Sequence, residues 1–338
     1  MRKERRIIKN YGKYIIFIVL AVIIIVGLSF FNDKPGDEFE VVKNTAFDQG
    51  EIKVLEDGTK YIVDPDKIRS GGPPKDGIPS IDDPKFVSVE EADAWIQDNE
   101  LVLAIIYKGV ERVYPLQIMV WHEIVNDKIA GDPVLITYCP LCGSGIAYER
   151  KIEGQEVEFG TSGKLYNSNL VMYDRKTDSY WSQIDGKAIV GELAGQELKA
   201  ISIDTVVWRD WKKARPGSEV LSQDTGFNRN YGRDPYGSYY EDSFLFFSVE
   251  NEDDRVHPKT VIFGIEINSE FKAYKEDDLK DMGAIEDVVG GVNIKVERDE
   301  VGIVKVTNLN TGEEIVKERD FWFAWYAFHP ETELYERE

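Results

Sequence analysis

The sequence predicts an α+β fold weighted toward β structure, with an N-terminal transmembrane helix followed by an exported domain of two related halves. The first half is predicted to carry a β-rich insertion. Three observations support this. Residues 14–31 form one uncharged apolar run. Most of the remaining chain consists of short alternating apolar runs separated by glycine-containing turns, which is typical of strands. Two blocks of sequence also recur, in the same order, farther along the chain.

The first 31 residues predict a membrane anchor. Residues 1–13 carry six basic side chains and one acidic side chain, and the apolar run 14–31 follows directly. As a helix this run extends about 27 Å, enough for the hydrocarbon core. The basic flank stays on the cytoplasmic side, so we expect 32–50 to be a tether and 51–338 an extracytoplasmic domain. The alternative is a cleaved signal peptide, whose apolar region is shorter and ends at a small-residue cleavage site.

The charge of the chain limits its partners. The formal net charge is −21. Binding to nucleic acid requires clustered Lys and Arg side chains that neutralise phosphates, so nucleic acid is not an expected partner. The membrane is the expected partner of the N-terminal helix, and the sequence does not specify another envelope partner.

The repeated blocks predict the internal organisation. Residues 103–138 align without gaps with 263–298, at an offset of 160 that places Tyr114 on Tyr274. At an offset of 114, Trp208-x-x-Trp211 falls on Trp322-x-x-Trp325. The offsets differ by 46, which predicts an insertion of about that length in the first copy. We therefore predict a first half at about 85–222, with the insertion at about 139–207, and a second half at about 245–338.

Local patterns predict several elements near these blocks. Ser88-Val-Glu-Glu91 is a capping box, which predicts a short helix through Trp95. Residues 116–127 (LQIMVWHEIVND) show helical spacing of apolar side chains, followed by a strand that leads to Cys139. Residues 174–178 are predicted to form a tight turn between two strands. The tryptophans of the repeated blocks are expected in the core.

The chain has two cysteines, in the sequence Cys139-Pro-Leu-Cys142-Gly after a predicted strand. A turn of this kind brings two sulfur atoms toward one metal ion. The same spacing also occurs in thiol–disulfide proteins, where the first cysteine opens a helix. Here Gly143-Ser144-Gly145 follows without helical periodicity, which favours the metal interpretation. A buried or disulfide-bonded pair without a function is the third interpretation.

The remaining metal ligands would come from elsewhere in the chain. His122 lies on the predicted helix beside the strand that leads to Cys139, and Met119 lies one turn before it. The second copy lacks the histidine and both cysteines, so the first copy alone carries this set. Cys139, Cys142 and His122 would leave one position open, as in catalytic or transfer sites. Sulfur ligands make either zinc or copper the expected ion.

Five polar residues near the cysteine pair in the predicted fold are candidates for lining a pocket. One belongs to a Gly- and Pro-rich loop at 68–86, and four belong to the predicted insertion; they are Asp76, Lys164, Tyr166, Asn167 and Asp174.

Several longer motifs together resemble a known family. They are SGGPPKDGIPSID, WHEIVND, TYCPLCGS, GTSGKLYNSNLVMYDRKTDSYWSQ and FWFAWYAFHPETELY. Over roughly 45–338 the chain resembles the exported domain-of-unknown-function family DUF 3179. The resemblance implies an envelope location and a single CPLC-type motif, and it implies no activity or cofactor.

The sequence thus favours a membrane-anchored extracytoplasmic protein, of unspecified activity, that binds one zinc or copper ion through its cysteine pair. The alternatives are a thiol–disulfide redox protein that uses the same pair and a non-catalytic envelope binding module rich in tryptophan. No constellation of acid and base residues assigns an enzymatic reaction, so whether the protein is an enzyme stays open.

Overall fold

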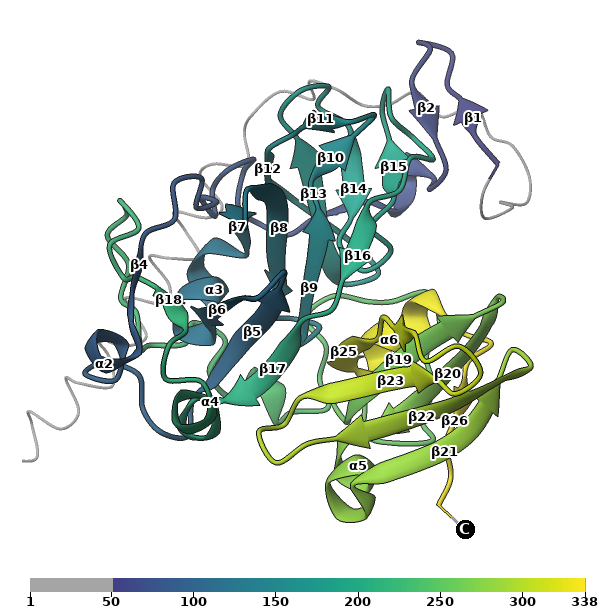
Figure 1. The fold of residues 1–338 in the computed structure, drawn as a ribbon. Coiled ribbons are helices and arrows are strands. Elements are labelled where there is room, and N and C mark those ends of the chain that lie inside the picture. Colours follow the sequence, from purple (N-terminus) through teal and green to yellow (C-terminus); the bar gives the residue numbers. More distant parts are fainter. Residues whose placement is uncertain (1–50, 338) are drawn as a thin grey trace, which may run out of the picture. The chain divides into compact units, whose positions relative to one another are not determined.

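The structure, a computed structural model, describes residues 51–337. The predicted cytoplasmic flank 1–13, anchor 14–31 and tether 32–50 lie outside these residues. Within 51–337, no helix is long and apolar enough to span a membrane. The described part is rich in strands and has few, short helices, which confirms the β-weighted α+β class (Figure 1).

One succession of elements occurs twice along the chain. It first comprises β5 (Leu101–Tyr107), β6 (Val110–Pro115), α3 (Leu116–His122), β7 (Ile124–Ile129), β8 (Asp132–Cys139) and β9 (Ser144–Glu149). It begins again 160 residues later, with Val261 in place of Leu101, as β19 (Val261–Ile267), β20 (Glu270–Lys275), α5 (Glu276–Met282), β21 (Ala284–Val289), β22 (Val292–Arg298) and β23 (Val304–Asn308).

A second set of elements follows each succession. After β9 it comprises β16 (Lys199–Ile201), β17 (Asp204–Val207), α4 (Trp208–Ala214) and β18 (Glu219–Leu221). After β23 it comprises β24 (Glu314–Ile315), β25 (Glu318–Phe321), α6 (Trp322–Phe328) and β26 (Glu333–Leu334). The sheets correspond as well. In the first pair of sheets, the order β17-β5-β6-β18, extended by β4 (Phe86–Ser88), corresponds to β25-β19-β20-β26. In the second pair, the order β7-β8-β9-β16 corresponds to β21-β22-β23-β24.

The same polar contacts recur in both sets. Each pair joins a buried aromatic side chain to an acceptor at the matching position: Tyr114–Asp127 and Tyr274–Asp287, Trp208–Asp93 and Trp322–Asp253, Trp211–Ser218 and Trp325–Thr332. All four tryptophans are at most 1% exposed, which confirms their expected place in the core. Since a buried indole N–H needs an acceptor, two of these bonds hold each of the helices α4 and α6 in place, one from its first residue and one from its middle.

Strands β10–β15 have no counterpart farther along the chain. They are β10 (Lys151–Ile152), β11 (Gln155–Glu156), β12 (Phe159–Tyr166), β13 (Asn169–Asp174), β14 (Tyr180–Ser182) and β15 (Ala188–Val190). Strands β12–β15 combine with β1 (Lys53–Val54), β2 (Lys60–Tyr61) and β3 (Arg69–Ser70) in a seven-stranded sheet of order β1-β2-β15-β14-β13-β12-β3. The predicted turn at 174–178 joins β13 to β14. Two 3₁₀ helices complete the elements, η1 (Pro65–Lys67) and η2 (Gly237–Tyr240).

The helix predicted over 116–127 is wrong beyond His122. Glu123 adopts a left-handed conformation with φ of 59°, and its N–H donates to the Met119 carbonyl, which ends the helix. Residues Ile124–Ile129 instead form β7, which pairs antiparallel with β8. The β-branched side chains of this segment favour a strand once a partner strand is available. The capping box at Ser88 is present, but its helix α2 (Val89–Ala92) is shorter than predicted.

The matching Tyr–Asp bonds lead to a stability prediction. We expect Tyr114→Phe to lower the free energy of unfolding by about 1–3 kcal/mol, because Asp127 is only 3% exposed and loses a donor. Tyr274→Phe is the matched control. Its acceptor Asp287 is 18% exposed, so water replaces the lost donor and we expect about 0.5–1.5 kcal/mol. Both aspartates keep an ion pair, Asp127 with Arg112 and Asp287 with Lys272. Urea unfolding of both variants tests this, and an equal or reversed order would contradict it.

Candidate functional site

The two cysteines lie at the hairpin between β8 and β9. Cys139 ends β8 and pairs with Ser144, and the Cys142 N–H donates to the Cys139 carbonyl at 3.1 Å. Gly143 closes the turn with a φ of +64°, and a Cβ atom there would lie 2.9 Å from the Phe321 ring. Only glycine meets both conditions without strain, which explains the residue after the second cysteine.

Both thiols are free and buried, with exposures of 2% for Cys139 and 0% for Cys142. The Cys142 thiol lies 3.5 Å from the Ser168 carbonyl and accepts a hydrogen bond of 3.5 Å from Asn169 Nδ2. Burial raises the pKa of the Cys142 thiol well above its ordinary value, and the adjacent Cys139 side chain raises it further. Burial therefore disfavours the thiolate form of Cys142.

Strand β25, from the far end of the chain, contacts this hairpin. The Phe321 N–H donates to the Cys142 carbonyl at 2.8 Å. Asp320, the preceding residue, is 0% exposed. Neither of its carboxylate oxygens accepts a hydrogen bond of good geometry among residues 51–337, although the Ser144 and Glu318 side chains lie beside it. Burial raises the pKa of Asp320 to about 7. Glu318, two residues earlier, also has an unpaired buried oxygen, and burial beside Asp320 raises its pKa.

The 3₁₀ helix η2 covers the other side of the hairpin. The Tyr239 hydroxyl donates to the Leu141 carbonyl at 3.1 Å, and the Tyr240 ring lies 6.3 Å from the Phe321 ring. Lys259 holds η2 in place, because its ammonium group donates to the carbonyls of Tyr239, Asp242 and Phe244 and lies over the Tyr239 ring. Aromatic side chains thus exclude water from the thiols on this side.

Unpaired buried polar atoms concentrate around the thiol hairpin. Of the nine such atoms in the described part of the chain, five belong to residues next to it: Ser168 Oγ, Tyr240 OH, Glu318 Oε2, Asp320 Oδ1 and Asp320 Oδ2. A buried polar atom without a partner costs free energy, so its retention calls for an explanation. Three of the five are carboxyl oxygens, and a carboxyl group attracts cations once it is ionised.

His122 does not face the thiols. Its Nδ1 lies 2.7 Å from the Pro79 carbonyl and its Nε2 lies 2.6 Å from the Tyr231 hydroxyl, so both ring nitrogens bind loop residues. Burial lowers the pKa of His122, although the Pro79 carbonyl opposes this. Met119 packs in a separate hydrophobic cluster from the one that contains the cysteines. No three His, Cys, Asp or Glu side chains within 51–337 gather as a metal-binding group.

The five candidate pocket residues do not share one cavity. Asp76 accepts from the Tyr173 hydroxyl at 2.6 Å, and Tyr166 packs edge-on against Phe328. The Asp174 carboxylate accepts from the Thr177 N–H and from Trp181 Nε1, which fixes the turn after β13. Lys164 pairs with Ser70 in the seven-stranded sheet. Asn167 lines a cavity of about 140 Å³, and it also donates to the Ala327 carbonyl.

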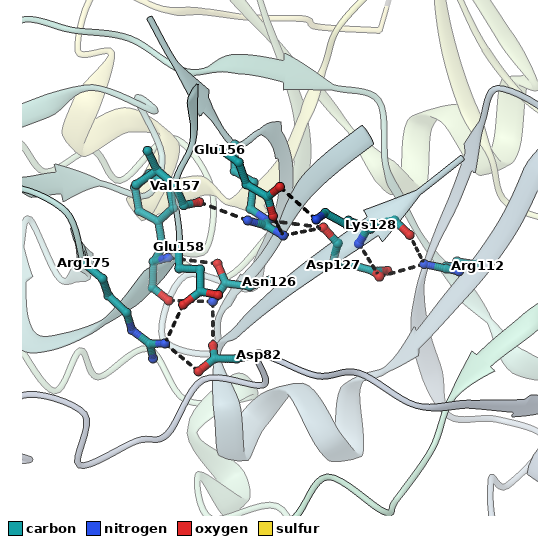
Figure 2. A network of polar contacts seen from close by, with 11 residues as sticks. Asp82, Arg112, Asn126, Asp127, Lys128, Glu156, Val157, Glu158 and Arg175 are labelled. Carbon is teal, nitrogen blue, oxygen red and sulfur yellow. Dashed lines mark hydrogen bonds and ion pairs between the residues drawn. The ribbon is translucent and has the colours of Figure 1, made fainter. Parts of the chain in front are cut away.

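A polar network braces the loop that carries Asp76 (Figure 2). Asn126 Nδ2 donates to Asp82 Oδ1 at 2.7 Å and to the Phe159 carbonyl at 2.8 Å. Arg175 donates to Asp82 Oδ2 at 2.6 Å and to Glu158 at 3.2 Å. Asp82 therefore connects the loop to β7 and to the turn after β13.

Sequence reasoning missed the residues that surround the thiols from β25 and η2. Glu318 and Asp320 are two residues apart on a strand, so both point to the same face. Two acids on one face of a strand, directly before the apolar segment FWFAW, were a signal that this face is buried. Nothing local to residues 236–240 indicated that their tyrosines lie over the cysteines.

These features define a class: a β-rich protein with a repeated succession of elements and a buried, free CxxC pair at the hairpin of its first copy. The chain belongs to the family described as "Protein of unknown function (DUF3179)", which matches residues 75–332 and confirms the resemblance. Comparison with curated proteins and with solved structures finds no match.

Glu123 leads to a pH prediction. It is 6% exposed, and burial raises its pKa to about 8 although the Tyr236 hydroxyl opposes this. A raised carboxyl pKa means that the folded state holds the proton longer than the unfolded state. The free energy of unfolding therefore falls as the pH rises from about 4.5 to about 8.

We expect Glu123→Gln to remove about 5 kcal/mol of this decline. Glu153→Gln is the matched control, because Glu153 also has a positive φ, of 52°, but is exposed. Urea unfolding between pH 5 and 9 measures the effect. If the free energy of unfolding falls with pH as steeply in Glu123→Gln as in the wild type, the assignment to Glu123 is contradicted.

Proposed function

We propose that this chain is a metal-handling protein in which Cys139 and Cys142 bind one zinc or copper ion. The observation that carries the proposal is the concentration of unpaired buried oxygens at the thiol hairpin. A cation between the thiolates and beside Asp320 offsets the cost of burying these groups. Binding releases the thiol protons, so affinity rises with pH.

The proposed site differs from the one that the sequence suggested. Both ring nitrogens of His122 are engaged by Pro79 and Tyr231. The acidic neighbour of the pair is Asp320, whose charge contributes to the electrostatic environment of Cys142. We assign the two thiolates as ligands and Asp320 as the adjacent negative charge that favours a cation.

Burial argues against the thiol–disulfide alternative. Exchange requires a thiolate to attack a partner's sulfur in line, so the sulfur must be accessible. At exposures of 2% and 0%, neither thiol offers a surface to a protein partner, whereas a metal ion needs little space. A raised thiol pKa also lowers the fraction of thiolate at Cys142.

We further propose that the site works outside the cytoplasm, in a chain anchored by residues 14–31. The support is the apolar run with its basic flank. The recurrence of elements at an offset of 160 supports an origin by duplication, with β10–β15 as the segment particular to the first half. In this proposal the ion occupies only the half that carries this segment.

The test is elemental analysis of the full chain, purified without a His tag. We expect close to one equivalent of zinc or copper in the wild type and less than about a tenth in Cys139→Ser/Cys142→Ser, because thiolates dominate binding of such ions. Asp320→Asn should weaken binding, and Asp281→Asn, an exposed carboxylate, is its matched control. His122→Gln should leave the metal content unchanged. Metal content that survives loss of both cysteines would refute the proposal.

A further inference from the structure

A cavity of about 560 Å³ opens beside the thiol hairpin, where Gly143 forms part of its wall. This volume lies within the range of small-molecule sites. Five apolar side chains, from both copies of the repeated elements, form much of the lining: Leu101, Leu116, Val120, Val261 and Phe321. Leu101 and Val261 occupy matching positions, the first residues of β5 and β19.

The cavity also holds hydrogen-bond donors that lack partners. Arg319 lines it with a side chain that is 11% exposed, and its one hydrogen bond in the described part of the chain runs from Nε to Glu276 at 3.3 Å. Both terminal nitrogens of its guanidinium therefore remain available. The Tyr240 hydroxyl is buried beside Asp234 and makes no hydrogen bond of good geometry within residues 51–337. Tyr138 lines the same cavity at 5% exposure.

The charges around the cavity restrict the ligand. Lys259 and Arg319 are balanced by Glu100 and Asp234, and the Lys259 ammonium is already bound by carbonyl oxygens. Arg319 is thus the positive group with free donors. A guanidinium binds a planar carboxylate through two parallel hydrogen bonds. A doubly charged anion would gain little here, because the two acidic side chains repel it.

We propose that this cavity binds a small organic monocarboxylate with an apolar body. The carboxylate accepts hydrogen bonds from the Arg319 guanidinium and the Tyr240 hydroxyl. The body packs against the apolar wall formed by β5, α3 and β19. This site uses neither cysteine, so it does not depend on the proposed metal ion.

Isothermal titration of the full chain tests the proposal, with detergent blanks. The probes are octanoate, 3-phenylpropionate and indole-3-acetate, each compared with its neutral amide. We expect at least one carboxylate to bind at least tenfold more tightly than its amide. Arg319→Gln should weaken that carboxylate about 10- to 100-fold, since it removes a charged hydrogen-bond donor. Arg337→Gln, an exposed arginine paired with Asp281, is the matched control and should change nothing.

Tyr240→Phe provides a second variant in case the loss of the Arg319–Glu276 pair disturbs folding. It should weaken the carboxylate about threefold to tenfold while leaving the amide unchanged. Cys139→Ser/Cys142→Ser should bind the carboxylate as the wild type does, which separates this proposal from metal binding. The proposal is overturned by absence of binding for all three carboxylates, by equal affinity for carboxylate and amide, by stronger binding of inorganic phosphate, or by loss of binding in the double cysteine variant.

Discussion

The hydrogen bond from the Phe321 N–H to the Cys142 carbonyl is the constraint on which the site depends. It joins a strand near the C-terminus to a hairpin almost 180 residues earlier. The Phe321 ring then lies against Gly143, where no larger residue fits. As a consequence, Asp320 is carried into the interior beside Cys142, and Arg319, on the opposite face of the strand, lines the cavity. One backbone contact therefore positions both candidate sites.

Local patterns in the sequence predicted the elements well where one periodicity prevailed. The alternating hairpins, the capping box at Ser88 and the turn after Asp174 all follow from short-range chemistry. The helix over 116–127 was extended too far because Val125 continues the helical face of Ile118 and Trp121 and also fits a strand. Pairing with β8 decided between them, and the left-handed Glu123 that separates helix from strand has no signature in its residue type.

The candidate site was only half predictable. The spacing of the two cysteines predicted that they lie close together, because four consecutive positions are close in any fold. Their other neighbours come from residues 168, 239 and 320, which tertiary pairing alone brings near. His122 was expected at the pair because its helix precedes the strand to Cys139. Its ring nitrogens instead form hydrogen bonds with Pro79 and Tyr231, which lie on two loops. The sequence does not reveal these contacts, because they depend on the path of both loops.

The two copies close the equivalent hairpin differently, and the difference falls at the two thiols. In the second copy the hairpin after β22 is closed by its own side chain, since Asp299 Oδ1 accepts from the N–H groups of Val301, Gly302 and Ile303. The hairpin after β8 has no such acid and is held from outside by Phe321, Tyr239 and Asn169. A turn that needs external support costs more to maintain than one that closes itself. Its retention, with two thiols at its tip, is expected if those thiols do work that a carboxylate cannot.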